Sequence, residues 1–241
     1  MLPLITVPKG LVLFFVTRPQ ALIPPAGEYP AGTGADPAPG VNPMTGTPFP
    51  PYGWSGTVSA FLAVPKTGWL AAMQEHHRQN MGSPAGQDQV AAWEQEYSLL
   101  GNELKQLVQA RPAFDECALI FDYEPPRPRG WHPDLIILAA TVYVVVFRTD
   151  DQVLQAHADQ LEAFAADLRR YHAGAPDSAV VPVLVHTRAK DLVVREGSVI
   201  FLSPNRIADF LTVESDVETG TTIDPAAWIA AGDAPASPAD R

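Results

Sequence analysis

Asp134 and Arg148 are the residues whose types and spacing come closest to a reactive site in this chain. Asp134 opens an apolar run, 134–139, and Arg148 directly follows a second one, 142–147. Two β-branched runs joined by a tight turn predict an antiparallel hairpin. A carboxylate at the head of such a hairpin is a suitable ligand for a hard cation such as Mg²⁺.

The register of this hairpin determines what Asp134 faces. With the turn centred near 140–141, we expect Asp134 to lie across from Arg148 and Ile136 across from Val146. All four side chains then point to one face of the sheet, because side chains alternate along a strand. The sequence therefore predicts that a guanidinium, and not a second carboxylate, approaches Asp134.

Three interpretations of this pair remain open. The first is a structural ion pair between Asp134 and Arg148. The second is a weak metal site in which Glu124 or Asp150 supplies the missing carboxylate. The third is contact of Arg148 with an anion or a nucleic acid. General-base catalysis by Arg148 is excluded, because the pKa of a guanidinium is above about 12.

The elements that must position these residues alternate between strands and helices, which predicts a three-layer α/β fold. A short anchored segment or helix follows Trp54, and a long amphipathic helix begins at Ser83-Pro84 and ends before Pro112. The other expected helices are 68–79, 151–173 and 205–211, and the expected strands are 118–123, 134–139, 142–147, 180–185 and 199–202. Helix 151–173 should pack on the sheet through Leu154, Leu161, Phe164 and Leu168.

Three regions follow from the composition. Residues 1–53 include a Pro- and Gly-rich stretch without apolar periodicity, which predicts a flexible arm that is cleaved rapidly by proteases. Residues 54–212 are expected to form the α/β domain, and 213–241 a linker-like tail.

The chain carries 27 acidic and 16 basic residues, a formal charge of −11, which argues against bulk attraction to nucleic acid. The single cysteine, Cys117, excludes an internal disulfide and a cysteine-rich zinc site. The apolar run 11–16 is too short for a secretory signal, and nothing approaches a membrane span. No phosphate-binding GxxxxGK[ST] loop occurs. We therefore expect a cytoplasmic protein without a membrane partner.

A set of landmarks in order along the chain carries a resemblance to a known family. They are the WSG at Trp54, the helix of Trp93, Tyr123-Glu124-Pro125, the 127–134 segment, Asp159-Gln160, Asp167-Leu168, Tyr171-His172, the VVPVLV strand, Trp228, Pro235 and Pro238. With these, the segment from Trp54 to about Pro238 resembles the N-terminal nuclease-like domain of Schlafen group 3-type bacterial DNA/RNA helicases. That domain is a relative of the PD-(D/E)xK nucleases.

The resemblance implies a restriction-endonuclease-like mixed sheet with flanking helices and a site built from Asp134, Arg148 and Gln160. It implies Mg²⁺ bound by Asp134 and Glu124 only if the site is active. The family's Glu-x-Lys is replaced here by Val146-Phe147-Arg148, so we expect no cofactor and little or no catalysis.

The expected role is then binding of nucleic acid or of a partner, such as a separate helicase. An active Mg²⁺-dependent nuclease with a rearranged site, and a purely structural interaction protein, are the alternatives.

Overall fold

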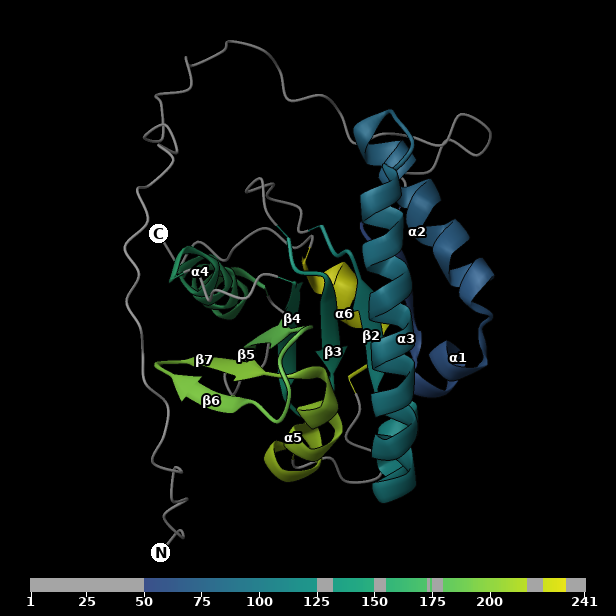
Figure 1. Ribbon diagram of the computed structural model, residues 1–241. Coiled ribbons are helices and arrows are strands. Elements are labelled where there is room, and N and C mark those ends of the chain that lie inside the picture. The colour runs from purple at the N-terminus through teal and green to yellow at the C-terminus, as the bar shows by residue number, and fades with distance from the viewer. Residues whose placement is uncertain are drawn as a thin grey trace, which may run out of the picture. The chain divides into compact units, whose positions relative to one another are not determined.

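The computed structural model describes residues 50–124, 132–149, 155–172, 174, 180–215 and 223–232, all within one compact unit, Pro39–Arg241. In this part of the chain, seven strands form one mixed sheet in the order β1-β2-β3-β4-β5-β7-β6 (Figure 1). Neighbours from β1 to β4 are antiparallel, β4, β5 and β7 are parallel, and β6 is antiparallel to β7. The strands are β1 Trp54–Thr57, β2 Ala118–Phe121, β3 Leu135–Leu138, β4 Val142–Arg148, β5 Val180–His186, β6 Val193–Glu196 and β7 Val199–Leu202.

Helices cover both faces of this sheet. The α-helices are α1 Val58–Ala63, α2 Lys66–Met81, α3 Gln87–Ala110, α4 Gln155–Tyr171, α5 Ile207–Glu214 and α6 Pro225–Gly232, and two short 3₁₀ helices are η1 Pro112–Glu116 and η2 Pro204–Arg206. Side chains of α1, α2, α3 and α5 share one buried cluster with one face of the sheet. Side chains of α4 and α6 share a second cluster with the other face. The predicted α/β class and the predicted central strands are thus confirmed.

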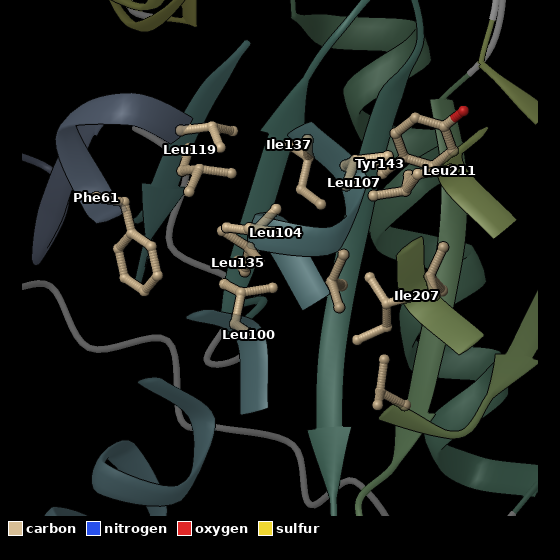
Figure 2. Close-up of a cluster of buried hydrophobic side chains, with 14 of the residues drawn as sticks. Phe61, Leu100, Leu104, Leu107, Leu119, Leu135, Ile137, Tyr143, Ile207 and Leu211 are labelled. Atoms are coloured by element: carbon tan, nitrogen blue, oxygen red, sulfur yellow. The ribbon is translucent and has the colours of Figure 1, made fainter. Parts of the chain in front are cut away.

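Alternation along β3 and β4 separates the two cores. Leu135, Ile137, Tyr143 and Val145 lie in the cluster with α3. The alternate residues, Ile136, Leu138, Val144 and Val146, lie in the cluster with α4. Both strands are buried at nearly every position, as is typical of central strands covered on both faces. Figure 2 shows Leu100, Leu104 and Leu107 of α3 against Leu135 and Ile137 of β3.

The register of the β3–β4 hairpin differs from the expected one by two residues. Leu135 pairs with Val145 and Ile136 with Val144, so the position of Asp134 falls opposite Val146 and not opposite Arg148. The loop is longer than the two residues assumed, and Ala139 N–H donates to the Thr141 carbonyl. A shift of two keeps every side chain on its face, because the side-chain period of a strand is two.

Several element boundaries also differ from the expected ones. Trp54–Thr57 is strand β1, which pairs with β2 before α1 begins. The N-cap of α3 is Gly86, so Ser83-Pro84 precedes the helix without starting it. Of the 1–53 segment only residues 50–53 are described, and there Gly53 N–H donates to the Phe121 carbonyl. Leu154 lies outside the described residues.

The region expected as a linker-like tail contains the end of α5 and the whole of α6. Trp228 of α6 is 1% exposed and packs against Tyr123, with ring centroids 5.2 Å apart. His172, at the end of α4, stacks on Trp228 at 3.9 Å. Gly232 has no room for a side chain, since a Cβ there would meet the Tyr123 hydroxyl at 2.5 Å. Close packing of two aromatic residues therefore fixes α6 on the sheet. Among the described residues, no helix has the length and apolar character needed to cross a membrane.

Burial lowers the pKa of His172 to about 4, from about 6.5 in an unfolded chain. The unfolded state therefore takes up a proton as the pH falls below about 6.5, and stability is lost down to about pH 4. His172→Phe keeps an aromatic ring over Trp228 without a titrating group. Relative to this variant, the wild type should lose up to about 3 kcal/mol between pH 6.5 and 4. Urea unfolding of both proteins across this range checks the prediction, and pH profiles that run parallel would contradict it.

Candidate functional site at the start of β3

Two donors hold Asp134 at the entrance to β3. The Phe147 N–H donates to Asp134 Oδ2 at 2.6 Å, and Arg148 Nη1 lies 3.5 Å from the same oxygen. Arg148 Nη1 also donates to the Phe147 carbonyl at 2.6 Å. The predicted approach of Arg148 to Asp134 is confirmed. Oδ2 of Asp134 thus contacts both the backbone of Phe147 and the side chain of Arg148, so the Asp134–Arg148 ion pair joins the start of β3 to the end of β4.

The position opposite Asp134 carries no polar group. Continuing the hairpin register by one residue places Val146 there. Val146 is 1% exposed and belongs to the apolar cluster that α4 covers. A metal site with two carboxylate ligands would need a second carboxylate beside Asp134, and the hairpin supplies only one.

Burial raises the pKa of Asp134 to about 6, although 27% of the side-chain surface is still exposed to solvent. Arg148 and the Phe147 N–H act in the opposite direction, and the charge of Asp122 adds to the increase. The desolvation of this carboxyl is therefore stronger than the stabilisation that its single ion pair supplies.

Glu96 of α3 is a further acidic residue near Asp134, and the sequence patterns did not predict it as part of the site. Burial has the largest effect and raises the pKa of Glu96 well above its usual range. The negative charges of Asp134 and Asp122 raise this pKa further, whereas the charge of Arg148 lowers it. The sequence did contain a signal, because Glu96 lies between Trp93 and Leu100 on the core-facing stripe of the helix. Glu96 is half-buried there, and a charged residue is seldom withdrawn from water without a reason.

Asp122, directly after β2, is the second acidic residue that was missed. Its φ of 55° places it in the left-handed region, which is uncommon for a residue other than glycine. The Asp122 N–H donates to the Asp134 carbonyl, and Asp122 Oδ1 lies 3.0 Å from His132 Nδ1. This contact with Asp122 raises the pKa of His132. The backbone of β2 thus turns so that Asp122 and Asp134 meet at one end of the sheet.

Glu124, proposed above as a metal ligand beside Asp134, is bound elsewhere. Its Oε1 accepts a hydrogen bond from Asn80 Nδ2 at 2.5 Å and lies 3.8 Å from His76 Nε2. Both of these partners belong to α2. Burial lowers the pKa of His76, and the charges of Asp122 and Glu124 partly offset this effect. Among the described residues, the acids whose charges couple to Asp134 are Glu96 and Asp122.

Gln160, the third expected site residue, is exposed on α4, whereas Leu161 and Phe164 of this helix are buried against the sheet. Within the described ranges, no hydrogen bond joins Gln160 to Asp134 or Arg148. Asp150, the other candidate for a second carboxylate beside Asp134, lies outside the described residues.

The donor set at Asp134 does not fit a Mg²⁺ site as it stands. In the part of the chain that the structure describes, no three His, Cys, Asp or Glu side chains converge as metal ligands. One oxygen of Asp134 is already engaged by Phe147 and Arg148, and Val146 occupies the facing position. The arrangement provides a partly buried carboxylate, Asp134, whose negative charge is compensated by the guanidinium of Arg148.

Comparison of the chain with models of protein families, with curated proteins and with solved structures finds no match.

Proposed function

We propose that this chain is a PD-(D/E)xK nuclease-like module that has lost metal-dependent catalysis and acts by binding, in the cytoplasm, within a DNA/RNA helicase system. The observation that carries the loss of catalysis is the pairing of Asp134 with Arg148 while Val146 faces it from β4. The guanidinium of Arg148 compensates the negative charge of Asp134, which a metal ion would otherwise compensate. The apolar side chain of Val146 stands where a second metal ligand would be needed.

The restriction-endonuclease-like part of this proposal is supported by element order. Helix α3 leads into the β2–β3–β4 meander, α4 crosses over, and β5 returns parallel to β4. An acid at the head of the central hairpin is the arrangement expected of such a core. The binding role follows from a preserved scaffold with an altered site.

A nuclease assay with Mg²⁺ or Mn²⁺ on single- and double-stranded DNA and on RNA tests the loss of catalysis. The wild-type chain should cleave little or not at all, which sets the baseline for the variants. The double variant Val146→Glu/Arg148→Lys should raise cleavage at least roughly tenfold, because even outer-shell partners of a metal ion are worth about 10- to 100-fold. Its matched control is Val146→Gln/Arg148→Lys, which has the same side-chain sizes without the new carboxylate.

Cleavage by the wild type that Asp134→Ala abolishes would overturn this proposal. It would establish the second candidate, an active Mg²⁺-dependent nuclease with a rearranged site. One observation favours that candidate: the charges of Asp134 and Asp122 raise the pKa of Glu96, and the charge of Asp122 raises the pKa of Asp134. In that case the single variant Glu96→Gln should reduce cleavage, as Asp134→Ala does.

Binding is measured on the same proteins by fluorescence anisotropy with labelled DNA and RNA at low salt. Low salt is needed because the net charge of −11 opposes association with a polyanion. Binding that Arg148→Ala weakens would identify nucleic acid as the ligand. Absence of binding to every nucleic acid would direct the binding role to a protein partner.

A further inference from the structure

Within the described residues, no strand pairs with the outer edge of β6, which carries two exposed valines. β6 is the last strand of the sheet and all four of its residues are exposed (Figure 1). Val193 and Val194 are 48% and 40% exposed. Natural edge strands are commonly protected by short length, charged side chains, proline, a bulge or a covering segment. Val193–Glu196 is short and carries Arg195 and Glu196, but it contains no proline, its register with β7 is regular, and Arg195 is paired with Glu214.

The backbone groups on this edge can be assigned from the hairpin. Gly197 and Ser198 form the two-residue turn between β6 and β7, and Gly197 has a φ of 59°. The pairs of an antiparallel ladder alternate between hydrogen-bonded and non-hydrogen-bonded. The Ser203 N–H donates to the Leu192 carbonyl, which fixes the phase of this alternation. Val193 and Arg195 therefore direct their N–H and C=O groups outward, away from β7.

We propose that two copies of this chain associate by pairing β6 with β6 in antiparallel orientation about a two-fold axis at Val194. In this register Val193 of each copy pairs with Arg195 of the other, and the four outward N–H groups meet the four outward C=O groups. Val194 faces its own counterpart as a non-hydrogen-bonded pair, in which side chains approach most closely. The sheets of the two copies become continuous.

The side chains of this edge suit a second copy. Arg195 lies across from Val193, so no like charges face each other, and its aliphatic stem covers the valine. Its guanidinium keeps the ion pair with Glu214 of α5, at 3.3 Å. Val213, the neighbour of Glu214, is 80% exposed. Among the described residues, three of the four large exposed hydrophobics thus lie on β6 and α5.

Charges of both signs lie beside this edge although the whole chain carries −11. Arg188, Lys190, Asp191, Arg195 and Glu196 lie in or just before β6, and Glu214 and Glu162 contact Arg195 and Ser198. This mixture of charges reduces the repulsion between two acidic molecules at the edge. In a two-fold register a second copy joins every outward N–H and C=O group of Val193 and Arg195, so none of them is left unpaired.

Site-specific oxidation tests this register. In Val194→Cys the two thiols face each other across the axis, at a Cβ separation of about 4.5–5.5 Å that approaches the range for a disulfide. The native Cys117 does not compete, because it is buried and burial raises its pKa to about 12. Val194→Cys should give a disulfide-linked dimer under mild oxidation. The matched control is Met81→Cys, since Met81 is 64% exposed on α2, and it should stay monomeric on a non-reducing gel.

Light scattering over a concentration series tests the association itself. The wild type should reach twice the 26.0 kDa chain mass, and Val194→Lys should halve it by placing two ammonium groups face to face. Val193→Pro should also give a monomer with intact circular dichroism, because the lost N–H points away from β7. Met81→Lys should leave the dimer unchanged. A wild type that is monomeric throughout, or a dimer that Val194→Lys does not affect, would overturn the proposal.

Discussion

Asp134→Asn is expected to increase the free energy of unfolding at pH 7 by about 2–3 kcal/mol. The reason is that burial raises the pKa of Asp134 to about 6. A carboxyl whose pKa is raised by about two units carries a cost of about 1.4 kcal/mol per unit when it is charged in the fold. An amide oxygen can still accept the hydrogen bond from the Phe147 N–H, and Arg148 keeps its bond to the Phe147 carbonyl.

The pH dependence distinguishes this explanation from a general effect of the substitution. A raised pKa means that the folded state holds the proton more tightly, so the stability contributed by Asp134 is complete below about pH 4 and is lost up to about pH 6. His172 acts in the opposite direction over nearly the same range. The contributions of these two residues should therefore nearly cancel from pH 4 to 6.5, and Asp134→Asn should expose the acid sensitivity due to His172.

Urea unfolding monitored by circular dichroism at several pH values gives both quantities. The matched control is Asp159→Asn, an aspartate on the exposed side of α4 whose carboxylate accepts a hydrogen bond from Gln155. The control should change stability by less than about 0.5 kcal/mol. If Asp134→Asn destabilises the protein at pH 7, the ion pair with Arg148 stabilises the fold by more than the burial of its carboxyl costs.

Leu135→Ala is expected to lower the free energy of unfolding by about 2–5 kcal/mol, the range for deleting a buried leucine side chain. Leu135 is fully buried between the sheet and α3 (Figure 2). It lines a small apolar cavity of about 10 Å³ together with Leu100, Phe147 and Ile207. Truncation enlarges an existing void, and the covered strand cannot move inward to fill it.

The midpoint of chemical unfolding measures this loss. Val213→Ala is the control, because Val213 is 80% exposed and its truncation removes little buried area. It should change stability by no more than about 0.5 kcal/mol. A cost below about 1 kcal/mol for Leu135→Ala would show that the surrounding side chains collapse into the space.

Local patterns predicted the centre of the fold well. The runs that form β3 and β4 are β-branched and apolar, and the apolar residues of α3 recur at three- and four-residue steps. In these elements the sequence pattern predicts both the type of secondary structure and the buried residues. The pairing of Asp134 with Arg148 was also correct despite an error of two residues in the register. Side-chain alternation alone determined the face, whereas the length of the turn determined the register.

What was missed depends on contacts between distant segments. β1 is four residues long and is a strand because it pairs with β2, which propensity does not encode. Glu96 and Asp122 approach Asp134 only once α3, β2 and β3 are assembled. Trp228 looked like part of a tail because an eight-residue helix shows too little periodicity to reveal a buried face.

The docking of α6 on β2 also has a consequence for the order of folding. The strands of the β2–β3–β4 meander are neighbours in sequence, so little chain entropy is lost when they meet. Trp228 reaches Tyr123 only after roughly one hundred intervening residues have been arranged, and long-range contacts of this kind form slowly. We therefore expect the molecule to assemble outward from its central hairpin, with α6 as the last helix to join and the first to detach.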